Sequence, residues 1–314
     1  MKEVVEQIRT KAKELLSEGK VDCVLGYKKG TVPMQEQPFC AYTPEEADQL
    51  TWSVFCTNNL ANFLIKNTGK TAVLAQGCVS RNIVGLIKEN QIKRENVYIL
   101  GIHSPGMVDA KKVQDKFPDK VIQEAYLEGE ELVVKGKDFT EHIPHRDVKR
   151  NNCYTCTHRN AVIYDEFVGE QGKESGGGNI DKVAYPWSKL DPEQRWEKFQ
   201  ETFKDCIRCY ACRNVCPLCY CDVCFVDESN PQWCGKGQEE TDIYTFHILR
   251  AFHCAGRCTD CGACESACPV GIKMRHLTSM LEADIREKYD YSPGLDLESV
   301  SPLSNYSQND PEIE

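Results

Sequence analysis

The chain has 314 residues, of which 41% are apolar and 27% charged, and its formal net charge is −10. The length predicts about two domains, the composition is that of a globular protein with a core, and the negative charge argues against nucleic acid or an anionic membrane as the main partner. No apolar run approaches the ~18 residues of a membrane span and no signal peptide is recognisable. We therefore expect a cytoplasmic protein without a membrane span, whose partners are other proteins.

The first part of the chain predicts helices alternating with strands. Apolar residues at helical spacing over 4–16 predict a helix that ends near Gly19, and residues 21–25 predict a strand. Residues 43–46 have the arrangement of a capping box with proline at the first helical position, which predicts a short helix there. A second helix is expected to carry the apolar residues of 60–64.

The next segment predicts a βαβ unit. Residues 71–75 and 97–102 are typical of buried strands, and residues 80–89 predict the helix between them. Such a unit requires a parallel sheet, so we predict an α/β N-terminal domain with a parallel sheet. Ligands bind beyond the carboxyl ends of parallel strands, where this chain has Gln76-Gly77-Cys78 just before a helix N-terminus. Cys78 is therefore well placed to hold a ligand.

Nineteen cysteines without a secretion signal indicate metal ligands, because a reducing cytosol disfavours disulfides. The pattern C-x2-C-x2-C-x3-C-P occurs twice. In this pattern three thiolates hold one 4Fe-4S cluster and the fourth ligates the other cluster. The spacing therefore predicts two crossed ligand sets, Cys206, Cys209, Cys212 and Cys268 for cluster 1 and Cys258, Cys261, Cys264 and Cys216 for cluster 2. Zinc is disfavoured because its sites use two cysteine pairs and have no use for the third spaced cysteine.

The double motif resembles the bacterial two-cluster ferredoxin and covers about residues 206–275. We expect a C-terminal ferredoxin-like domain of α+β class, rich in cysteine and with a largely helical insert. Such clusters transfer one electron each with little change of shape, at potentials between roughly −700 and +450 mV, and the acidic chain favours the low end.

The domain boundaries follow from composition. We predict an α/β domain over 1–168, a linker over the glycine-rich and charged residues 169–181, a ferredoxin-like domain over 182–291 and a flexible acidic tail over 292–314. Within the third segment, residues 191–194 are typical of a helix start, and apolar residues over 277–285 recur at helical spacing.

The insert between the two motifs carries five more cysteines. One interpretation is a further metal site formed by Cys219, Cys221 and Cys224 and completed by Cys234, since such a group can cap a cluster or a zinc ion. The alternative is that these thiols are small buried hydrophobes that shield the clusters from water. Cys254 lies in an apolar stretch, where a core residue is the preferred interpretation.

The N-terminal region has its own candidate ligands. Two single cysteines before expected helices and one CxxC pair suffice for a third 4Fe-4S cluster at the sheet edge, held by Cys56, Cys78, Cys153 and Cys156. A redox dithiol or buried thiols are the alternatives. Cys23 and Cys40 lie in segments typical of strands and are interpreted as core residues. No nucleotide or flavin fingerprint is recognisable, because the glycine run 176–178 lacks the required spacing.

The segments QGCVSRNIVGLI, YTCTHRNAVIYDEFVGE, CPLCYCDVC and RAFHCAGRCTDCGACESACP together resemble iron-sulfur electron-transfer subunits of anaerobes. Such subunits accompany heterodisulfide reductase-like proteins, formate dehydrogenases, hydrogenases or tungsten aldehyde oxidoreductases. The resemblance spans nearly the whole chain. The front is also similar to beta subunits of deazaflavin-reducing hydrogenases and formate dehydrogenases, which implies a flavin.

The function expected from these observations is electron relay between partner subunits of an oxidoreductase complex, without a catalytic residue in this chain. The alternative is a beta-type subunit that binds flavin or deazaflavin and exchanges hydride for single electrons. A third class is a cysteine-rich sensor or scaffold, which would need no low-potential redox activity.

Overall fold

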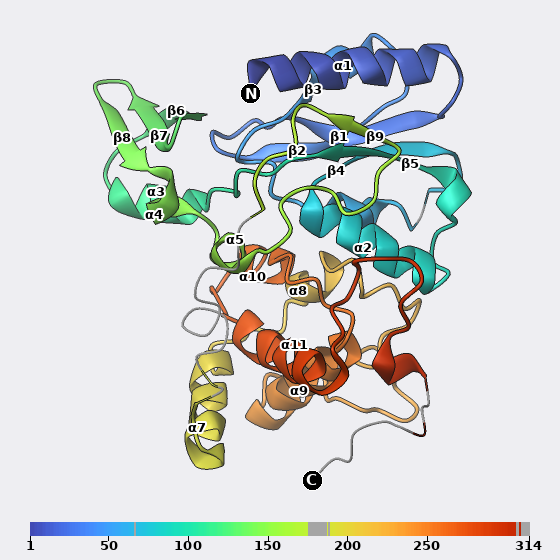
Figure 1. Cartoon of the computed structure of the whole chain (residues 1–314). Coiled ribbons are helices and arrows are strands. Elements are labelled where there is room, and N and C mark those ends of the chain that lie inside the picture. Colours follow the sequence, from blue (N-terminus) through green and yellow to red (C-terminus); the bar gives the residue numbers. More distant parts are fainter. Residues whose placement is uncertain (66, 175–186, 188, 306–307, 309–314) are drawn as a thin grey trace. The chain divides into compact units, whose positions relative to one another are not determined.

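The computed structural model describes residues 1–65, 67–174, 187, 189–305 and 308 (Figure 1). The chain divides into two compact units. Unit 1 comprises Met1–Ser80 and Glu89–Gly178, and unit 2 comprises Arg81–Lys88 and Asn179–Glu314. The expected linker at 169–181 falls in part outside the described residues, so the predicted domain boundaries stay a prediction. Unit 2 takes in Arg81–Lys88, which the sequence assigned to the first domain.

Unit 1 is built on a mixed, mostly parallel sheet, which confirms the predicted α/β class. Its strands are β1 (Cys23–Lys29), β2 (Glu36–Ala41), β3 (Leu50–Thr51), β4 (Thr71–Ala75), β5 (Val97–Ile102) and β9 (Glu166–Val168). The order is β2-β1-β4-β5-β9, with β3 also paired to β1. The pairs β1·β4, β4·β5 and β5·β9 are parallel, and β2 and β3 run antiparallel to β1.

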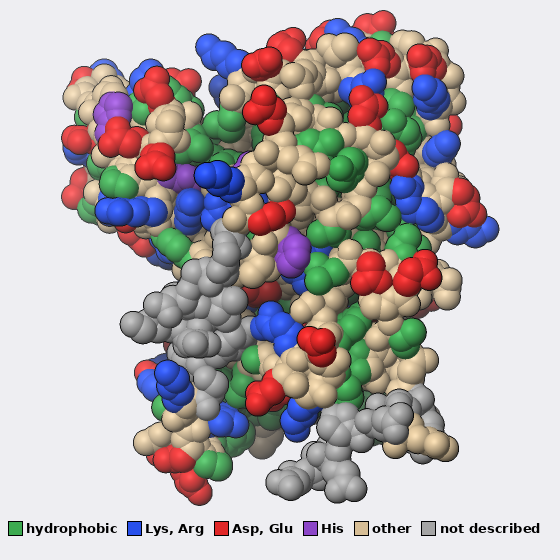
Figure 2. Space-filling model, viewed as in Figure 1, with side chains coloured by type: hydrophobic (Ala, Val, Ile, Leu, Met, Phe, Trp, Pro, Cys, Tyr) green, Lys and Arg blue, Asp and Glu red, His purple; other side chains and the backbone are tan. Residues whose placement is uncertain are grey.

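The first helix covers one face of this sheet (Figure 1). Helix α1 (Lys2–Ser17) buries Ile8, Ala12 and Leu15, and the chain turns away at Gly19, which has a φ of 63°. Both ends of the helix agree with the prediction. On the outer side of α1 and just after it, lysine and arginine side chains form ion pairs with glutamates. Figure 2 shows acidic and basic side chains interspersed over this region.

The βαβ unit forms as predicted, with strands β4 and β5 at the predicted residues. Helix α2 (Gly77–Lys88) begins three residues earlier than expected, because Ser80 N donates to the carbonyl of Gln76 at 2.9 Å. The Ser80 hydroxyl also donates to the Gly77 carbonyl at 3.0 Å. Cys78 consequently lies inside the first turn of α2 and not before it.

Two predicted short helices are 3-10 turns, η1 (Glu46–Gln49) and η2 (Leu60–Phe63). The expected cap exists, since Glu46 N donates to the Thr43 hydroxyl at 3.3 Å. The turn stays short because Leu50 is already extended and enters β3. A 3-10 turn, η3 (Arg94–Asn96), also precedes β5.

A second, antiparallel sheet was not expected from the sequence. Its strands β6 (Ile122–Glu128), β7 (Glu131–Gly136) and β8 (Thr140–Pro144) follow α3 (Ala110–Lys116) and precede the short helices α4 (His145–Val148) and α5 (Asn151–Thr155). These elements share a core of Val54, Phe55, Val108, Val113, Ile122, Leu132, Val134, Ile143 and Val148.

Unit 2 is helical within residues 189–305. It contains α7 (Pro192–Phe203), α8 (Ala211–Asn214), α9 (Glu240–Cys254), α10 (Ala263–Ser266), α11 (Arg275–Tyr289) and the 3-10 turn η4 (Pro302–Ser304). Helix α7 starts with the predicted capping box at Asp191, and α11 covers the predicted apolar repeat. The expected α+β class is corrected for this part of the chain, where the structure has no strand. The residues around the motifs have helical periodicity, and they pack as helices around Phe199, Phe203 and Phe246.

The start of the predicted flexible tail makes hydrogen bonds within unit 2. The Arg81 guanidinium donates to the Pro293 carbonyl at 3.1 and 2.7 Å, and Lys88 Nζ donates to the Ser299 hydroxyl at 3.0 Å. The flexibility predicted for residues 292–314 itself stays a prediction. Among the described residues, no helix is both long and apolar enough to cross a membrane.

Candidate iron-sulfur sites

The two cysteine motifs fold into loops with the same backbone conformation. In the first loop Arg208 and Tyr210 have positive φ angles of 51° and 59°, and in the second Asp260 and Gly262 have 56° and 69°. A four-residue helix follows in each loop, α8 and α10, and these two helices contact each other. When residues with left-handed and right-handed backbone conformation alternate, successive backbone N–H groups point to the same side. Such a concave set of N–H groups binds anions and iron-sulfur clusters. Both loops have the backbone geometry that suits a cluster.

The thiols predicted to hold cluster 1 are neighbours. Burial raises the pKa of Cys206, and negative charge on Cys268 and Cys209 raises it further. Burial raises the pKa of Cys212 to about 11; the Arg250 cation opposes this, while charges on Cys206 and Cys268 add to it. Cys268 belongs to the second motif and packs, like Cys206 and Cys212, against the core around Phe203 and Phe246.

The thiols predicted to hold cluster 2 are likewise neighbours. Burial raises the pKa of Cys258, and the charges of Cys261 and Cys264 contribute to the rise. Burial also raises the pKa of Cys264, with charge on Cys216 and Cys261 acting in the same direction. Cys216 comes from the first motif, as the crossed arrangement requires. The ligand assignment itself stays a prediction for both sets.

A buried histidine contacts one of these thiols. His247 on α9 has 3% exposure, stacks on Phe203 at 4.0 Å between ring centroids, and its Nε2 lies 3.3 Å from Cys206 Sγ. Burial lowers the pKa of His247 to about 3, so the ring is neutral near pH 7. With the proton on Nε2 it donates a hydrogen bond to the Cys206 sulfur, the kind of contact that tunes a cluster ligand. Sequence reasoning assigned His247 no role.

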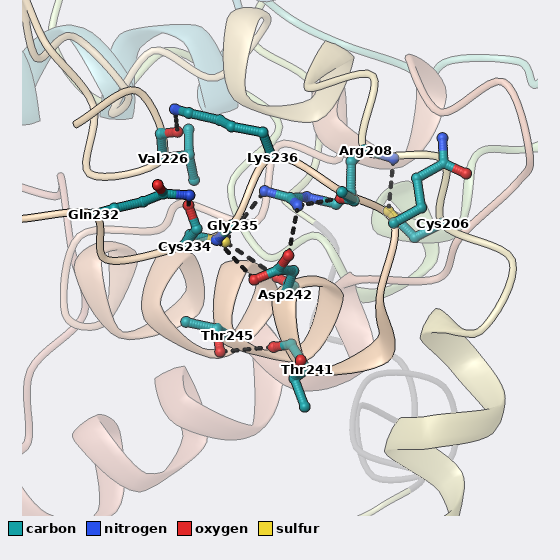
Figure 3. Close-up of polar contacts among 12 residues, drawn as sticks. Cys206, Arg208, Val226, Gln232, Cys234, Gly235, Lys236, Thr241, Asp242 and Thr245 are labelled. Carbon is teal, nitrogen blue, oxygen red and sulfur yellow. Dashed lines mark hydrogen bonds and ion pairs between the residues drawn. The ribbon is translucent and has the colours of Figure 1, made fainter. Parts of the chain in front are cut away.

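The first loop is fastened to the insert by Arg208 (Figure 3). Its backbone N donates to Cys206 Sγ at 3.4 Å, and its buried guanidinium donates to Cys234 Sγ at 3.2 Å and to the Gly237 carbonyl. The guanidinium also forms an ion pair with Asp242 at 3.5 Å. We call this set of contacts the Arg208 clasp.

The cysteines of the insert do not gather as one set. Cys234 belongs to the Arg208 clasp and donates its S–H to the Asp242 carbonyl at 3.3 Å, whereas Cys221 is exposed and Cys224 is half-buried. Among the described residues, the structure brings Cys219 together with Cys216 and Cys254, whose sulfur atoms all lie within 4.8 Å of one another. The further metal site predicted from Cys219, Cys221, Cys224 and Cys234 stays a prediction.

Cys254 is a site residue that sequence reasoning missed. It has 3% exposure near the end of α9, in agreement with its interpretation as a core residue, but it also lies against the thiols of Cys216 and Cys219. Hydrogen bonds from Cys216 and Cys254 lower the pKa of Cys219. The sequence contains one indication of this position. Cys254 lies on the buried face of a helix that leads directly into the second cysteine motif.

In unit 1, Cys78 and Cys156 are brought together by a close approach of backbone to Gly77. Gly77 N donates to the Arg159 carbonyl at 3.4 Å, and a Cβ at Gly77 would lie 1.9 Å from the His158 carbonyl oxygen. Cys156 Sγ donates to this same His158 carbonyl at 3.3 Å. Glycine is therefore required at position 77 for the loop that carries Cys156 to reach the start of α2.

Arg150 connects the other two thiols of unit 1. Its Nη1 donates to the Thr57 carbonyl at 3.0 Å, next to Cys56, and its backbone N donates to the Met107 carbonyl at 2.9 Å. Met107 N in turn donates to Cys153 Sγ at 3.3 Å.

The phenol of Tyr27 lies near two of the unit 1 thiols. It is fully buried, and its pKa is raised by burial and by charge on Cys56 and Cys78. These contacts place all four predicted thiols on neighbouring segments of unit 1. Their assignment to a third cluster stays a prediction. Cys23 is buried in β1 as expected, while Cys40 is half-buried in β2.

The residues present fit iron-sulfur clusters. Thiolates are the ligands these clusters use, and cluster potentials depend on hydrogen bonds to sulfur. Two of the thiols predicted for cluster 1 accept such a bond: Arg208 N donates to Cys206 Sγ, and Ile272 N, just after the second motif, donates to Cys268 Sγ at 3.2 Å.

Comparison with known proteins gives relatives over nearly the full length. No family model matches the chain. It is 26% identical over 352 residues to the F420-dependent formate dehydrogenase subunit beta of Methanocaldococcus jannaschii, covering 93% of this chain and 92% of the relative. It is 25% identical over 354 residues to the F420-dependent formate dehydrogenase 1 subunit beta of Methanococcus maripaludis, covering 93% and 91%.

The chain is similar to formate dehydrogenase beta subunits. The resemblance expected from the sequence, to a subunit of an anaerobic oxidoreductase complex, is confirmed by these relatives. A solved structure of the F420-reducing NiFe hydrogenase complex from Methanosarcina barkeri contains a chain with 15% identity and a TM-score of 0.41, covering 66% of this chain and 90% of that chain.

Proposed function

We propose that this chain is an iron-sulfur electron-transfer subunit, which relays low-potential electrons between partner subunits of a cytoplasmic oxidoreductase complex. The observation that carries the proposal is the matched pair of motif loops, in which Arg208 and Tyr210 correspond to Asp260 and Gly262. The similarity to beta subunits of formate dehydrogenase supports assembly with partner subunits.

In this proposal the chain's own residues hold and insulate the clusters. The eight motif cysteines ligate two 4Fe-4S clusters in crossed sets, and Cys56, Cys78, Cys153 and Cys156 hold a third. When bound, the clusters supply one-electron transfer. His247 and the backbone N–H groups of the loops donate hydrogen bonds to ligand sulfur, and the aromatic core around Phe203 and Phe246 excludes water.

The first test is iron and acid-labile sulfide per chain after anaerobic purification, with zinc and flavin assayed in the same sample. Two clusters give about eight irons, three give about twelve, and a further site gives about sixteen. We expect about twelve. Fewer than about eight irons, or stoichiometric zinc in their place, would contradict the proposal.

The crossed ligation has a test of its own. Cys206→Ser and Cys268→Ser lie in different motifs, yet both should perturb the same paramagnetic signal, and the double variant should lose no more clusters than either single one. Cys216→Ser is the matched control and should perturb the other signal. Separate signals for Cys206→Ser and Cys268→Ser would contradict crossing.

A second candidate function is favoured by the names of the relatives, which are F420-dependent enzymes. In this alternative unit 1 binds a flavin or the deazaflavin F420 and exchanges hydride for single electrons. A flavin spectrum of the anaerobically prepared chain, with reduction of the clusters by reduced F420, would favour the alternative. Reduction by dithionite but not by reduced F420, in a chain without flavin, would favour the relay.

A further inference from the structure

Arg250 is a buried cation in the interior of unit 2. It lies on α9 with 5% exposure, and its Nη2 donates to the Cys212 carbonyl at 3.2 Å while its Nη1 lies 3.9 Å from Met274 Sδ. Within the part of the chain that the structure describes, its Nε has no hydrogen-bond partner. The guanidinium is therefore only partly satisfied by neutral groups.

Two other buried arginines of unit 2 show what Arg250 lacks. Arg208 is paired with Asp242 at 3.5 Å, and Arg275 donates to Asp260 at 2.5 and 2.6 Å. For Arg250 the structure gives no carboxylate within ion-pair distance among the described residues. A buried charge is costly unless it is compensated, so its compensating charge must come from other groups.

Cysteines from both predicted ligand sets lie around Arg250. Its Nη2 donates to the Cys212 carbonyl, and Cys254, one helical turn further along the same buried face of α9, has its sulfur within 4.8 Å of the Cys216 sulfur. Negative charge on these thiols and on Cys264 favours the charged guanidinium. Cys212 belongs to the predicted cluster 1 set, and Cys216 and Cys264 to the cluster 2 set. The positive charge of the Arg250 guanidinium therefore lies close to predicted ligands of both clusters.

We propose that Arg250 is a fixed internal cation shared by the two predicted clusters, and that it holds the reduction potentials of both above the values they would have without it. This rests on the proposed function. Reduction adds one electron to a cluster without making or breaking a bond, and the electron comes from a partner redox subunit. A nearby cation stabilises the more negative, reduced form. Arginine keeps its charge at any working pH, so Arg250 acts as a positioning residue with a permanent charge.

The test is an EPR-monitored redox titration of the anaerobically purified full chain, with dithionite as reductant. Arg250→Met and Arg250→Gln remove the charge, and Gln can keep a hydrogen bond to the Cys212 carbonyl. In both variants we expect the reduced-to-oxidised ratio of both clusters at a fixed potential to fall about tenfold, equivalent to ~59 mV for a one-electron couple. Arg250→Lys keeps the charge, so the reduced-to-oxidised ratio of both clusters should stay close to the wild-type value.

Arg257→Met is the matched control. Arg257 is partly exposed, precedes Cys258 directly and donates to the His253 carbonyl at 2.7 Å and the Tyr220 hydroxyl at 2.8 Å. Solvent screens its charge, so its removal should change the ratio much less. Unchanged midpoint potentials in iron-replete Arg250→Met and Arg250→Gln, or a shift no larger than in the control, would overturn the proposal. A shift in Arg250→Lys as large as in Arg250→Met would also overturn it, because shape and not charge would then matter.

Iron content resolves the case in which a variant does not assemble. Loss of iron from Arg250→Met and Arg250→Gln but not from Arg250→Lys would support the shared internal cation, since Lys is close to Met in size and keeps the positive charge. Loss of iron from all three would overturn it in favour of a packing role. If the wild-type chain itself holds no cluster, the proposed function fails. If it holds both clusters and the titrations do not move, only this inference fails.

Discussion

At the scale of single residues, His145 makes stability depend on pH. It is buried on α4, and its Nε2 lies 2.9 Å from the Gly106 carbonyl oxygen. Burial lowers its pKa to about 4, and the charge of Lys149 acts in the same direction. The neutral ring therefore donates to this carbonyl near pH 7.

The direction of the effect follows from proton binding. An unfolded histidine has a pKa near 6.5, so between about pH 6.5 and 4 the unfolded chain binds more protons than the folded chain. The free energy of unfolding should then fall as the pH is lowered through this window. We expect His145 to account for a loss of roughly 2 kcal/mol between pH 7.5 and pH 5.

Denaturant unfolding of wild type and His145→Gln at both pH values measures this contribution. The variant should lose roughly 2 kcal/mol less than the wild type on acidification. Thr140→Ala, at an exposed position on β8 without an ionisable side chain, is the control and should keep the wild-type dependence. Equal pH dependence in wild type and His145→Gln would contradict the prediction.

Single residues also show where prediction from sequence stopped. The eight motif cysteines could be proposed as ligands because their spacing follows from the shape of a cluster, and that assignment stays a prediction. His247 and Arg250 could not be proposed in this way, because their roles depend on which groups α9 meets when it packs. Both lie on the face of α9 that carries the buried residues Ile243 and Phe246. Polar residues on an otherwise apolar helix face are the pattern that indicates a buried partner.

At the scale of elements, the Arg208 clasp makes the first loop depend on the insert. Asp242 on α9 pairs with Arg208 and accepts a hydrogen bond from Gly235 N at 2.7 Å (Figure 3). Asp242→Ala leaves the buried guanidinium without its carboxylate, at a cost of roughly 2 kcal/mol. We expect faster chelator-induced bleaching of cluster 1, with cluster 2 lost at the wild-type rate.

Visible absorption and EPR during exposure to a chelator distinguish the two clusters. Asp222→Ala is the matched control, because Asp222 is an exposed aspartate of the same insert. Both clusters of Asp222→Ala should be bleached by the chelator at the wild-type rate. Equal acceleration of both clusters in Asp242→Ala would contradict a role confined to the first loop.

Elements with strong periodicity were predicted well and weakly patterned ones were missed. Strands β4 and β5 are fully or almost fully buried, so their apolar runs are unambiguous. Strand β6 has one buried residue, Ile122, and β8 has one, Ile143, so neither shows the alternation that indicates a strand. The turns η1 and η2 have helix-start signals but stay short. After η1 the chain is already extended at Leu50, and after η2 it continues as a turn from Leu64.

At the scale of the whole molecule, replacing Cys78 with serine tests whether unit 1 holds a third cluster besides the two proposed for the cysteine motifs. Cys78 is in unit 1, and the eight motif cysteines are in unit 2. Cys78→Ser should lower the iron content by about four and remove or perturb one paramagnetic signal, leaving the ferredoxin-type pair unchanged. EPR and iron analysis after anaerobic purification measure both.

Cys23→Ser is the control for Cys78→Ser, because Cys23 is buried in unit 1 beside Thr71 and is no predicted ligand. Iron content should be unaffected by it. An unchanged spectrum and iron content in Cys78→Ser would remove the third cluster from the proposal.

The overall role was the easiest property to predict and the site contacts were the hardest. Cysteine spacing and the resemblance of long segments indicated a redox subunit, and the relatives bear this out. The grouping of Cys216, Cys219 and Cys254 depends on how α9 ends, which no spacing rule describes.

The two matched loops differ in the conformational free energy that their backbone costs, and from this difference we expect an order of cluster insertion. Left-handed backbone costs an ordinary residue roughly 1–2 kcal/mol and costs glycine nothing. The first loop imposes it on Arg208 and Tyr210, whereas the second imposes it on Asp260 and Gly262. We therefore expect the second loop to form at lower cost in a newly made chain, whereas the first loop gains the contacts of the Arg208 clasp only when the insert is folded. A cell that assembles or repairs this protein should fill cluster 2 before cluster 1.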